Sequence, residues 1–374
     1  MRISLLPAGA VLLLASAASA QHADRSTFIV GTAHAAPGTT ATGVLDIPAG
    51  VDSALTIQVA VVHGARPGPV VALIAGTHAT EYATSIAMQR LIPRIDPAKL
   101  AGTVIIVPVV NVPSFTSMTP VINPVDRKTM VGGYPGDSTG TQSQRAMWAL
   151  TQQVVAQANV LVDFHGGDLD EDVGAPFVDA VRTGRATDSQ AVKLARAFGV
   201  NHILITDRDP SSPRAGGTLA GQGVIRDQTV LLVGTGRSGM VTPADITTDI
   251  NGSLNMLAAL GMLARPATRA RGRVIYLDGS GPRIAAKGDG VWFAVARPNS
   301  VIARGGILGY TTDFLGKKTG DVESPIAGLV VYVHGVPSMR RGVVLAEVLP
   351  VLPRVEPWKA PVARGGRGGG RGGD

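Results

Sequence analysis

The sequence predicts an α/β fold whose mixed, mostly parallel sheet is flanked by helices, followed by a small all-β, barrel-like domain. Between residues 43 and 270, short apolar runs alternate with longer segments of helical character, as in a sheet covered by helices on both faces. After residue 271 the chain is rich in Gly and Val and has almost no helical periodicity, which favours strands.

The strands expected in the α/β part are apolar runs of strand length. Residues 54–62 alternate between apolar and polar side chains, and residues 104–110 are almost entirely apolar, which is typical of a central strand. The other expected strands cover residues 70–75, 160–164, 202–205 and 229–233. The expected helices cover residues 81–91, 142–158, 189–198 and 250–263, and the second of these has a clear apolar stripe.

The chain is expected to begin with a signal peptide over residues 1–20. Arg2 supplies a positive start, a mostly apolar stretch follows, and Ala18-Ser19-Ala20 has the small residues that a signal peptidase accepts. The apolar stretch is short for a membrane span, so we expect none after cleavage, with an uncleaved anchor as the alternative. The protein is therefore expected to be periplasmic or secreted and bacterial.

The remaining chain divides into an α/β domain at residues 21–270, a small β domain at 271–353 and an Arg/Gly-rich tail at 354–374. The tail cannot form a core and is expected to be disordered. Such tracts can bind RNA, but a flexible tail is the favoured reading. In the β domain, two similar stretches indicate repeated hairpins of the biotinyl- or lipoyl-type, although no Lys stands at a hairpin tip to carry a cofactor.

The composition narrows the function classes. The chain of 374 residues contains no Cys, which excludes disulfides, thiolate metal sites and a Cys nucleophile. Any metal must then be held by His, Asp or Glu. The formal net charge is +7, but the basic residues are not clustered in a dense stripe along the sequence. Together with the expected export, this argues against nucleic acid as a partner.

The candidate metal ligands are His78, Glu81 and His165. His78 and Glu81 are three residues apart at the start of an expected helix, so their side chains share a face. His165 ends another apolar run, and ligands collect at the carboxyl ends of strands in α/β sheets. Two His and one carboxylate suit a zinc ion that keeps a position open for water. The alternative is two ordinary buried histidines, because His-x-x-Glu often arises by chance.

At this point the chain resembles the succinylglutamate desuccinylase/aspartoacylase family of zinc carboxypeptidase-like deacylases, over roughly residues 28–349. The matching segments stand in the family's order along the chain. They are Pro67-Gly68-Pro69, the stretch from Gly76 to Glu81, Pro108-Val109-Val110-Asn111, Asn123-Pro124-Val125-Asp126, Tyr134-Pro135-Gly136, Asp163-Phe164-His165-Gly166-Gly167, Gly234-Thr235-Gly236-Arg237-Ser238-Gly239 and Ser324-Pro325-x-x-Gly328.

The resemblance implies one Zn²⁺ per chain, held by His78, Glu81 and His165. It also implies hydrolysis of amide bonds in small N-acyl amino-acid-like or peptide substrates, in which zinc polarises the carbonyl and activates water as the nucleophile. A Glu of the family takes the proton of that water and passes it to the leaving amine. The resemblance does not specify the acyl group, the amine or the oligomeric state.

Two departures from the family pattern concern substrate and proton handling. Val131 and Gly132 stand where the family has an Asn-Arg pair that binds substrate carboxylate, and neither can donate a side-chain hydrogen bond. Arg127 or Lys128 could take over that role. Gly234 stands where the family has its general-base Glu. Glu171, on an acidic loop after His165, is the one uncommitted Glu of the α/β domain and the candidate replacement.

Three hypotheses follow. The favoured one is an exported zinc-dependent amidohydrolase. The second is a catalytically degenerate relative that binds zinc or a ligand without turnover, since Gly234 cannot carry a proton. The third is a polysaccharide- or surface-binding module built on the β domain, which the low aromatic content of 4% does not favour.

Overall fold

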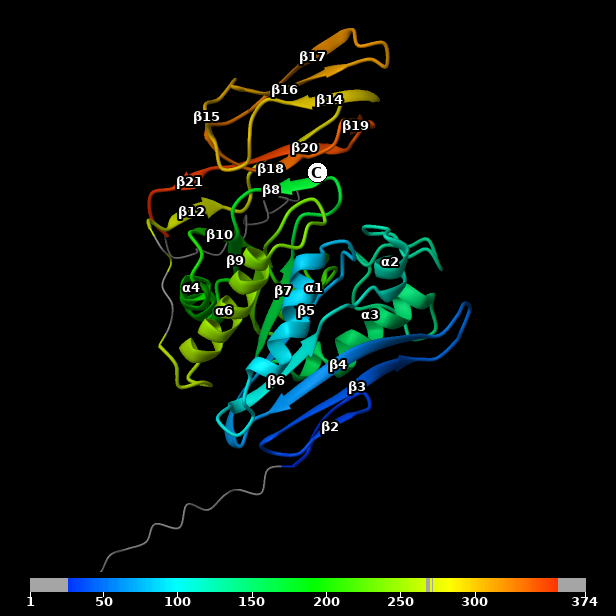
Figure 1. The fold of residues 1–374 in the computed structure, drawn as a ribbon, viewed down its shortest axis with the longest axis vertical. Coiled ribbons are helices and arrows are strands. Elements are labelled where there is room, and N and C mark those ends of the chain that lie inside the picture. The colour runs from blue at the N-terminus through cyan, green and yellow to red at the C-terminus, as the bar shows by residue number, and fades with distance from the viewer. Residues whose placement is uncertain (1–25, 267–269, 271, 356–374) are drawn as a thin grey trace, which may run out of the picture.

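The computed structural model describes residues 26–266, 270 and 272–355 (Figure 1). The predicted signal peptide at 1–20 lies outside the described residues, as does the predicted tail except for residues 354 and 355. Within the described residues, no helix combines the length and the apolar character that crossing a membrane requires.

The fold is built on one ten-stranded sheet in the order β21-β12-β10-β9-β11-β7-β5-β6-β4-β3. These strands are, in that order, Val351–Leu352, Ile275–Asp278, His202–Asp207, Phe177–Arg182, Thr229–Gly234, Val160–His165, Arg66–Ala75, Ala101–Val107, Leu55–His63 and Thr39–Ile47. Five of the nine pairings are parallel and four are antiparallel. The predicted mixed, mostly parallel sheet is confirmed.

Helices cover both faces of this sheet. On β5, Leu73 packs in one buried cluster with α1, α4 and α6, while the next residue, Ile74, packs in a second cluster with α3 and α5. Alternation along a strand explains the division, because successive side chains point to opposite faces. The helices are α1 (Tyr82–Leu91), α2 (Val112–Ser117), α3 (Gln142–Gln153), α4 (Thr187–Phe198), α5 (Leu219–Val224) and α6 (Pro243–Ala259). Short 3₁₀ turns follow α1 at Ile92–Arg94 and α3 at Val155–Gln157.

Several boundaries differ from the prediction. The predicted helix at 250–263 begins at Pro243, because Thr242 caps it by accepting a hydrogen bond from the Asp245 N–H. The predicted helix at 142–158 ends as an α-helix at Gln153. Strands β3 and β9 and helices α2 and α5 were not expected from the sequence.

The C-terminal part forms two antiparallel sheets around a separate apolar core (Figure 1). One sheet contains β13, β20, β18 and β15, and the other contains β17, β16, β14 and β19. Their strands are β13 (Arg283–Ala285), β14 (Gly290–Ala294), β15 (Val301–Ile302), β16 (Ile307–Thr312), β17 (Lys318–Glu323), β18 (Gly328–His334), β19 (Ser338–Met339) and β20 (Val344–Leu349). A small hairpin of β1 (Phe28–Val30) and β2 (Ala33–Ala35) lies at the other end of the chain.

The two parts of the chain are joined through strands rather than through a linker alone. Strand β8 (Glu171–Val173), from the α/β part, pairs with β18. In return, β12 and β21 from the C-terminal part extend the large sheet beside β10. The predicted boundary at residue 271 therefore falls just before a strand of the large sheet, although the C-terminal sheets themselves are all-β as expected.

Candidate metal centre and active-site cavity

The three predicted metal ligands lie together at one edge of the large sheet. Strands β5 and β7 are parallel neighbours in register, with Ala75 beside Phe164, so the residues that follow them emerge at the same edge. Gly76 turns the chain sharply after β5 with φ +71°, where a side chain would meet the backbone of Val109. Glu81 then stands at the N-cap of α1, and His165 ends β7.

The buried Glu81 carboxylate joins the two imidazoles. Its Oε1 lies 3.1 Å from His78 Nδ1 and its Oε2 lies 3.1 Å from His165 Nδ1. One ligand atom from each residue falls within 4.8 Å of the others, a spacing that can hold a metal ion. Two imidazole nitrogens and one carboxylate are a donor set that zinc accepts in catalytic sites.

Electrostatics favours the charged form of the carboxylate. Burial opposes ionisation of Glu81, but the charges and hydrogen bonds of His165 and His78 lower its pKa to about 2. The carboxylate is thus an anion at any physiological pH. Burial also opposes protonation of His165, yet Asp163 and Glu81 raise its pKa well above the ordinary value. The site as a whole therefore attracts positive charge.

Asp163 supports the site from behind. Its Oδ2 lies 3.3 Å from His165 Nε2, on the opposite side of the ring from Glu81. A carboxylate in this place fixes the orientation of the ring and strengthens the other nitrogen as a ligand. Asp163 is buried two residues before His165 on the same strand, so its side chain points to the same face.

The ligands open into a cavity of about 380 Å³ that both parts of the chain enclose. The α/β part contributes Glu171, Phe177 and Arg208 beside the ligands, and the C-terminal part contributes Arg283, Tyr332 and Glu347. None of the C-terminal residues, and neither Phe177 nor Arg208, was predicted from the sequence. Their approach depends on β8 pairing with β18 and on β12 joining the large sheet.

At the predicted position of the general base, the structure places an aromatic ring. Gly234 pairs in register with His165 on β7 and with Phe177 on β9, so side chains at all three positions share a face. A Cβ atom on Gly234 would lie 2.3 Å from two ring atoms of Phe177. The ring therefore fills the space beside the ligands that a longer side chain at 234 would need.

The predicted substitute base, Glu171, lines the same cavity as the three ligands. Burial, followed by the negative charge of Glu81, raises its pKa above the ordinary value. Its Oε2 accepts a hydrogen bond of 3.1 Å from the Asp168 N–H. Burial and Glu81 also raise the pKa of Asp168, to about 7. The acidic loop after His165 thus brings one Glu to the candidate site.

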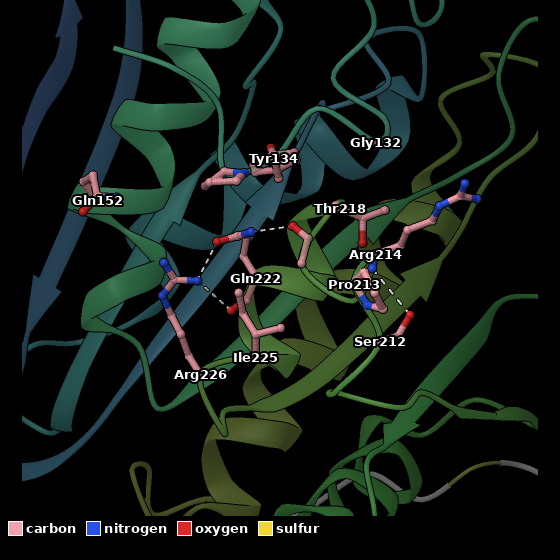
Figure 2. Close-up of a pocket in the computed structure, with 13 residues that line it drawn as sticks. Gly132, Tyr134, Gln152, Ser212, Pro213, Arg214, Thr218, Gln222, Ile225 and Arg226 are labelled. Carbon is pink, nitrogen blue, oxygen red and sulfur yellow. Dashed lines mark hydrogen bonds between the residues drawn. The ribbon is translucent and has the colours of Figure 1, made fainter. Parts of the chain in front are cut away.

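The predicted anion-binding residues lie elsewhere. Arg127 and Lys128 are exposed and do not line the cavity, and Lys128 Nζ donates to Gln144 Oε1 at 3.1 Å. Gly132 faces a different pocket of about 870 Å³ between α5 and the loops at 132–135 and 212–218 (Figure 2). Arg226 lines this second pocket and donates to Gln222 Oε1.

Three polar residues that the sequence did not single out also line the cavity: Asp179, Thr206 and Arg208. Asp179 is buried, and burial raises its pKa to about 6. Its Oδ2 accepts a hydrogen bond of 2.7 Å from Thr206. Arg208 points its Nε to a buried place where no described residue accepts its hydrogen bond. Asp179 lies inside β9 and not at a strand end, so no local sequence signal marks it as a cavity residue.

Comparisons with known proteins agree with this architecture. The model of the succinylglutamate desuccinylase/aspartoacylase catalytic domain matches residues 67–260, just over half of the chain. A similar curated protein is the N-alpha-acetyl-L-2,4-diaminobutyric acid deacetylase of Halomonas elongata. It is 28% identical over 241 residues, which are 63% of this chain and 68% of the relative.

Two solved structures share the fold. The product-bound ectoine utilization protein from Ruegeria pomeroyi superposes with a TM-score of 0.75 at 21% identity, over 83% of this chain and 95% of that chain. The succinylglutamate desuccinylase/aspartoacylase from Rhodobacter sphaeroides gives a TM-score of 0.75 at 22% identity, over 88% of this chain and 97% of that chain. At these identities the matches establish the fold.

Proposed function

The chain belongs to the succinylglutamate desuccinylase/aspartoacylase family, and from that premise we propose that it is an exported zinc-dependent hydrolase of amide bonds. Its substrates would be small N-acyl amino-acid-like or peptide molecules. The observation that carries the proposal is the convergence of His78, Glu81 and His165 in the lining of one cavity. The acidic, buried Glu81 and the supporting Asp163 fit a bound zinc ion.

When bound, zinc supplies Lewis acidity toward the amide carbonyl and toward the attacking water. The protein must then move one proton from the water to the leaving amine. Glu171 is the proposed carrier, because it lines the cavity and its raised pKa brings it closer to neutral pH. Asp168 holds Glu171 through its backbone N–H and does not itself line the cavity.

Arg208 is the proposed partner for a negative group of the substrate. Its Nε is buried without a protein acceptor among the described residues, and its side chain lines the cavity. A buried donor left unpaired costs free energy, which a substrate carboxylate would recover on binding. Arg283 lines the same cavity but already lies 3.2 Å from Glu347.

The test is a panel of N-acyl amino acids, assayed with zinc-loaded wild type and with Glu171→Gln. We expect measurable hydrolysis by wild type and a loss of roughly 10²–10⁴-fold in kcat for the variant, with the zinc content unchanged. Glu323→Gln, on an exposed strand of the C-terminal part, is the matched control and should leave kcat intact. A Glu171→Gln enzyme as active as wild type would remove Glu171 from the mechanism.

A second function is favoured by one observation. The ring of Phe177 over Gly234 removes the place of the expected base, as in a relative that binds zinc or a ligand without turnover. Hydrolysis by wild type that disappears in His78→Ala would exclude this second function. Zinc binding without hydrolysis of any member of the panel would instead support it.

A further inference from the structure

We propose that the cavity selects amides in which the group next to the cleaved bond is apolar and larger than a methyl group. The inference rests on the proposed function and specifies its substrate class. It comes from the apolar wall of the cavity, which is the ring of Phe177 covering Gly234 directly beside His165.

The wall begins at the metal ligands. Gly234 is paired with His165, so the surface next to this ligand is formed by whatever covers the glycine. The ring of Phe177 covers it, and Phe177 is only partly buried and lines the cavity. A group bound to the reacting carbonyl therefore meets hydrocarbon where an acidic side chain would otherwise stand.

The apolar surface continues away from the ligands. Leu204 and Leu232 from the large sheet, and Val331 and Leu349 from the C-terminal part, line the same cavity. Leu204 and Leu349 belong to one buried cluster against which Phe177 and Val331 pack. Both parts of the chain thus contribute apolar side chains to the cavity, beside the polar residues around Arg208.

Size and charge point in the same direction. A cavity of about 380 Å³ is larger than an acetyl group requires, and ligand cavities of a few hundred Å³ hold ligands of many heavy atoms. The acidic residues Glu171, Asp179 and Glu347 also line it, and Glu347 already pairs with Arg283, so a second negative group would meet mostly negative charge. An apolar group gains by leaving water and loses no hydrogen bond.

The apolar group can stand on the acyl side or on the amine side of the bond. Ketone analogues separate these two sources, since a methylene in place of the amide nitrogen cannot be hydrolysed. 4-Oxopentanoic acid mimics N-acetylglycine, 4-oxononanoic acid mimics N-hexanoylglycine, and 2-(2-methylpropyl)-4-oxopentanoic acid mimics N-acetylleucine. Their dissociation constants for the zinc-loaded full chain, measured by calorimetry, report binding independently of turnover.

At least one of the two larger ketones is expected to bind ten or more times tighter than 4-oxopentanoic acid. Each fully buried methylene increases the affinity roughly three- to fourfold, so two or three of them account for a tenfold difference. Phe177→Ala should reduce that preference at least threefold, whereas Phe177→Leu, which keeps an apolar side chain, should retain most of it. Phe293→Ala, which removes an exposed ring of β14 outside the cavity, should change nothing.

Equal affinity of wild type for the three ketones would overturn the inference, and so would a preference that Phe177→Ala leaves unchanged. The wild-type comparison decides the matter even if a variant fails to fold. The proposed function stands or falls separately, on zinc content and on hydrolysis of the N-acyl amino acid panel. A chain that hydrolyses N-acetylglycine but shows no apolar preference keeps its function and loses this specificity.

Discussion

At the scale of single residues, Gly234 and Phe177 distinguish this site most clearly from the pattern that its family resemblance implies. Sequence alone reveals the glycine, because it follows an apolar strand at the expected position. It does not reveal the ring, since Phe177 lies 57 positions earlier and reaches Gly234 only through the antiparallel pairing of β9 with β11. The absence of an acidic side chain at position 234 and the presence of the Phe177 ring beside it are therefore one structural change.

The first prediction concerns this pair. Gly234→Glu should lower the free energy of unfolding by about 2–4 kcal/mol, because the new side chain overlaps the ring of Phe177 and buries a carboxylate. Adding Phe177→Ala should recover much of that loss by making room. Urea denaturation of the two variants measures the effect. A single variant as stable as wild type would mean that the ring moves aside freely.

The second prediction concerns Asp163. Asp163→Asn keeps the size of the side chain and removes the charge that faces His165 Nε2. Zinc affinity should fall roughly 10–100-fold, as for other residues that orient a metal-binding His. Competition with a chromophoric chelator measures it. Asp188→Asn, on α4 away from the ligands, is the control. Unchanged affinity in Asp163→Asn would show that His165 needs no such support.

The third prediction concerns the buried Asp249 of α6. Burial raises its pKa to about 8, so it is neutral in the folded protein at pH 6 and ionised in the unfolded chain. Its contribution is greatest below the unfolded pKa near 4 and is lost as the pH rises toward 8. Asp249→Asn should therefore be more stable than wild type at pH 8 by a few kcal/mol, at about 1.4 kcal/mol per pKa unit.

Thermal unfolding at pH 4 and pH 8 tests this prediction. The stability difference between wild type and Asp249→Asn should shrink to less than about 1 kcal/mol at pH 4, where both side chains are neutral in the folded protein and the unfolded Asp is only about half ionised. Asp96→Asn, a substitution at an exposed position, is the control. A difference of the same size at both pH values would assign the effect to packing rather than to ionisation.

At the scale of elements, periodicity identified the strands and helices that pack with one clear face. The runs that became β5, β6, β7 and β11 are mostly apolar, as buried parallel strands are. Strand β9 was missed because Asp179 and Arg182 interrupt its apolar pattern. Both side chains are buried, and each has a polar partner on β10. Such pairing cannot be read from a local segment.

The fourth prediction concerns the start of α6, which is set by an N-cap and not by the apolar periodicity of the helix. Thr242 accepts a hydrogen bond of 3.2 Å from the Asp245 N–H, and the helix begins at Pro243, seven residues before the predicted start at residue 250. Thr242→Ala should cost about 1 kcal/mol of stability in urea denaturation. Thr247→Ala, an exposed position inside the same helix, should cost nothing. An equal loss of stability in the two variants would show that the Thr242 cap does not stabilise the helix.

At the scale of the whole molecule, the clustering of the proposed metal ligands was predictable and the rest of the cavity lining was not. His78, Glu81 and His165 lie close to their strand ends, so local pattern and the order of parallel strands bring them together. Tyr332 and Glu347 reach the same cavity only because strands from distant parts of the chain pair with one another. Contacts of this kind leave no local signature in the sequence.

The central claim is that one zinc ion binds at His78, Glu81 and His165. The most direct test is the zinc content of the full chain. The protein is equilibrated with zinc, unbound metal is removed, and the bound zinc is measured by elemental mass spectrometry. We predict close to one zinc per wild-type chain and less than about a tenth of that in a His78→Ala, His165→Ala double variant that remains folded. A wild-type chain without zinc, or a variant with as much zinc as wild type, would contradict the account.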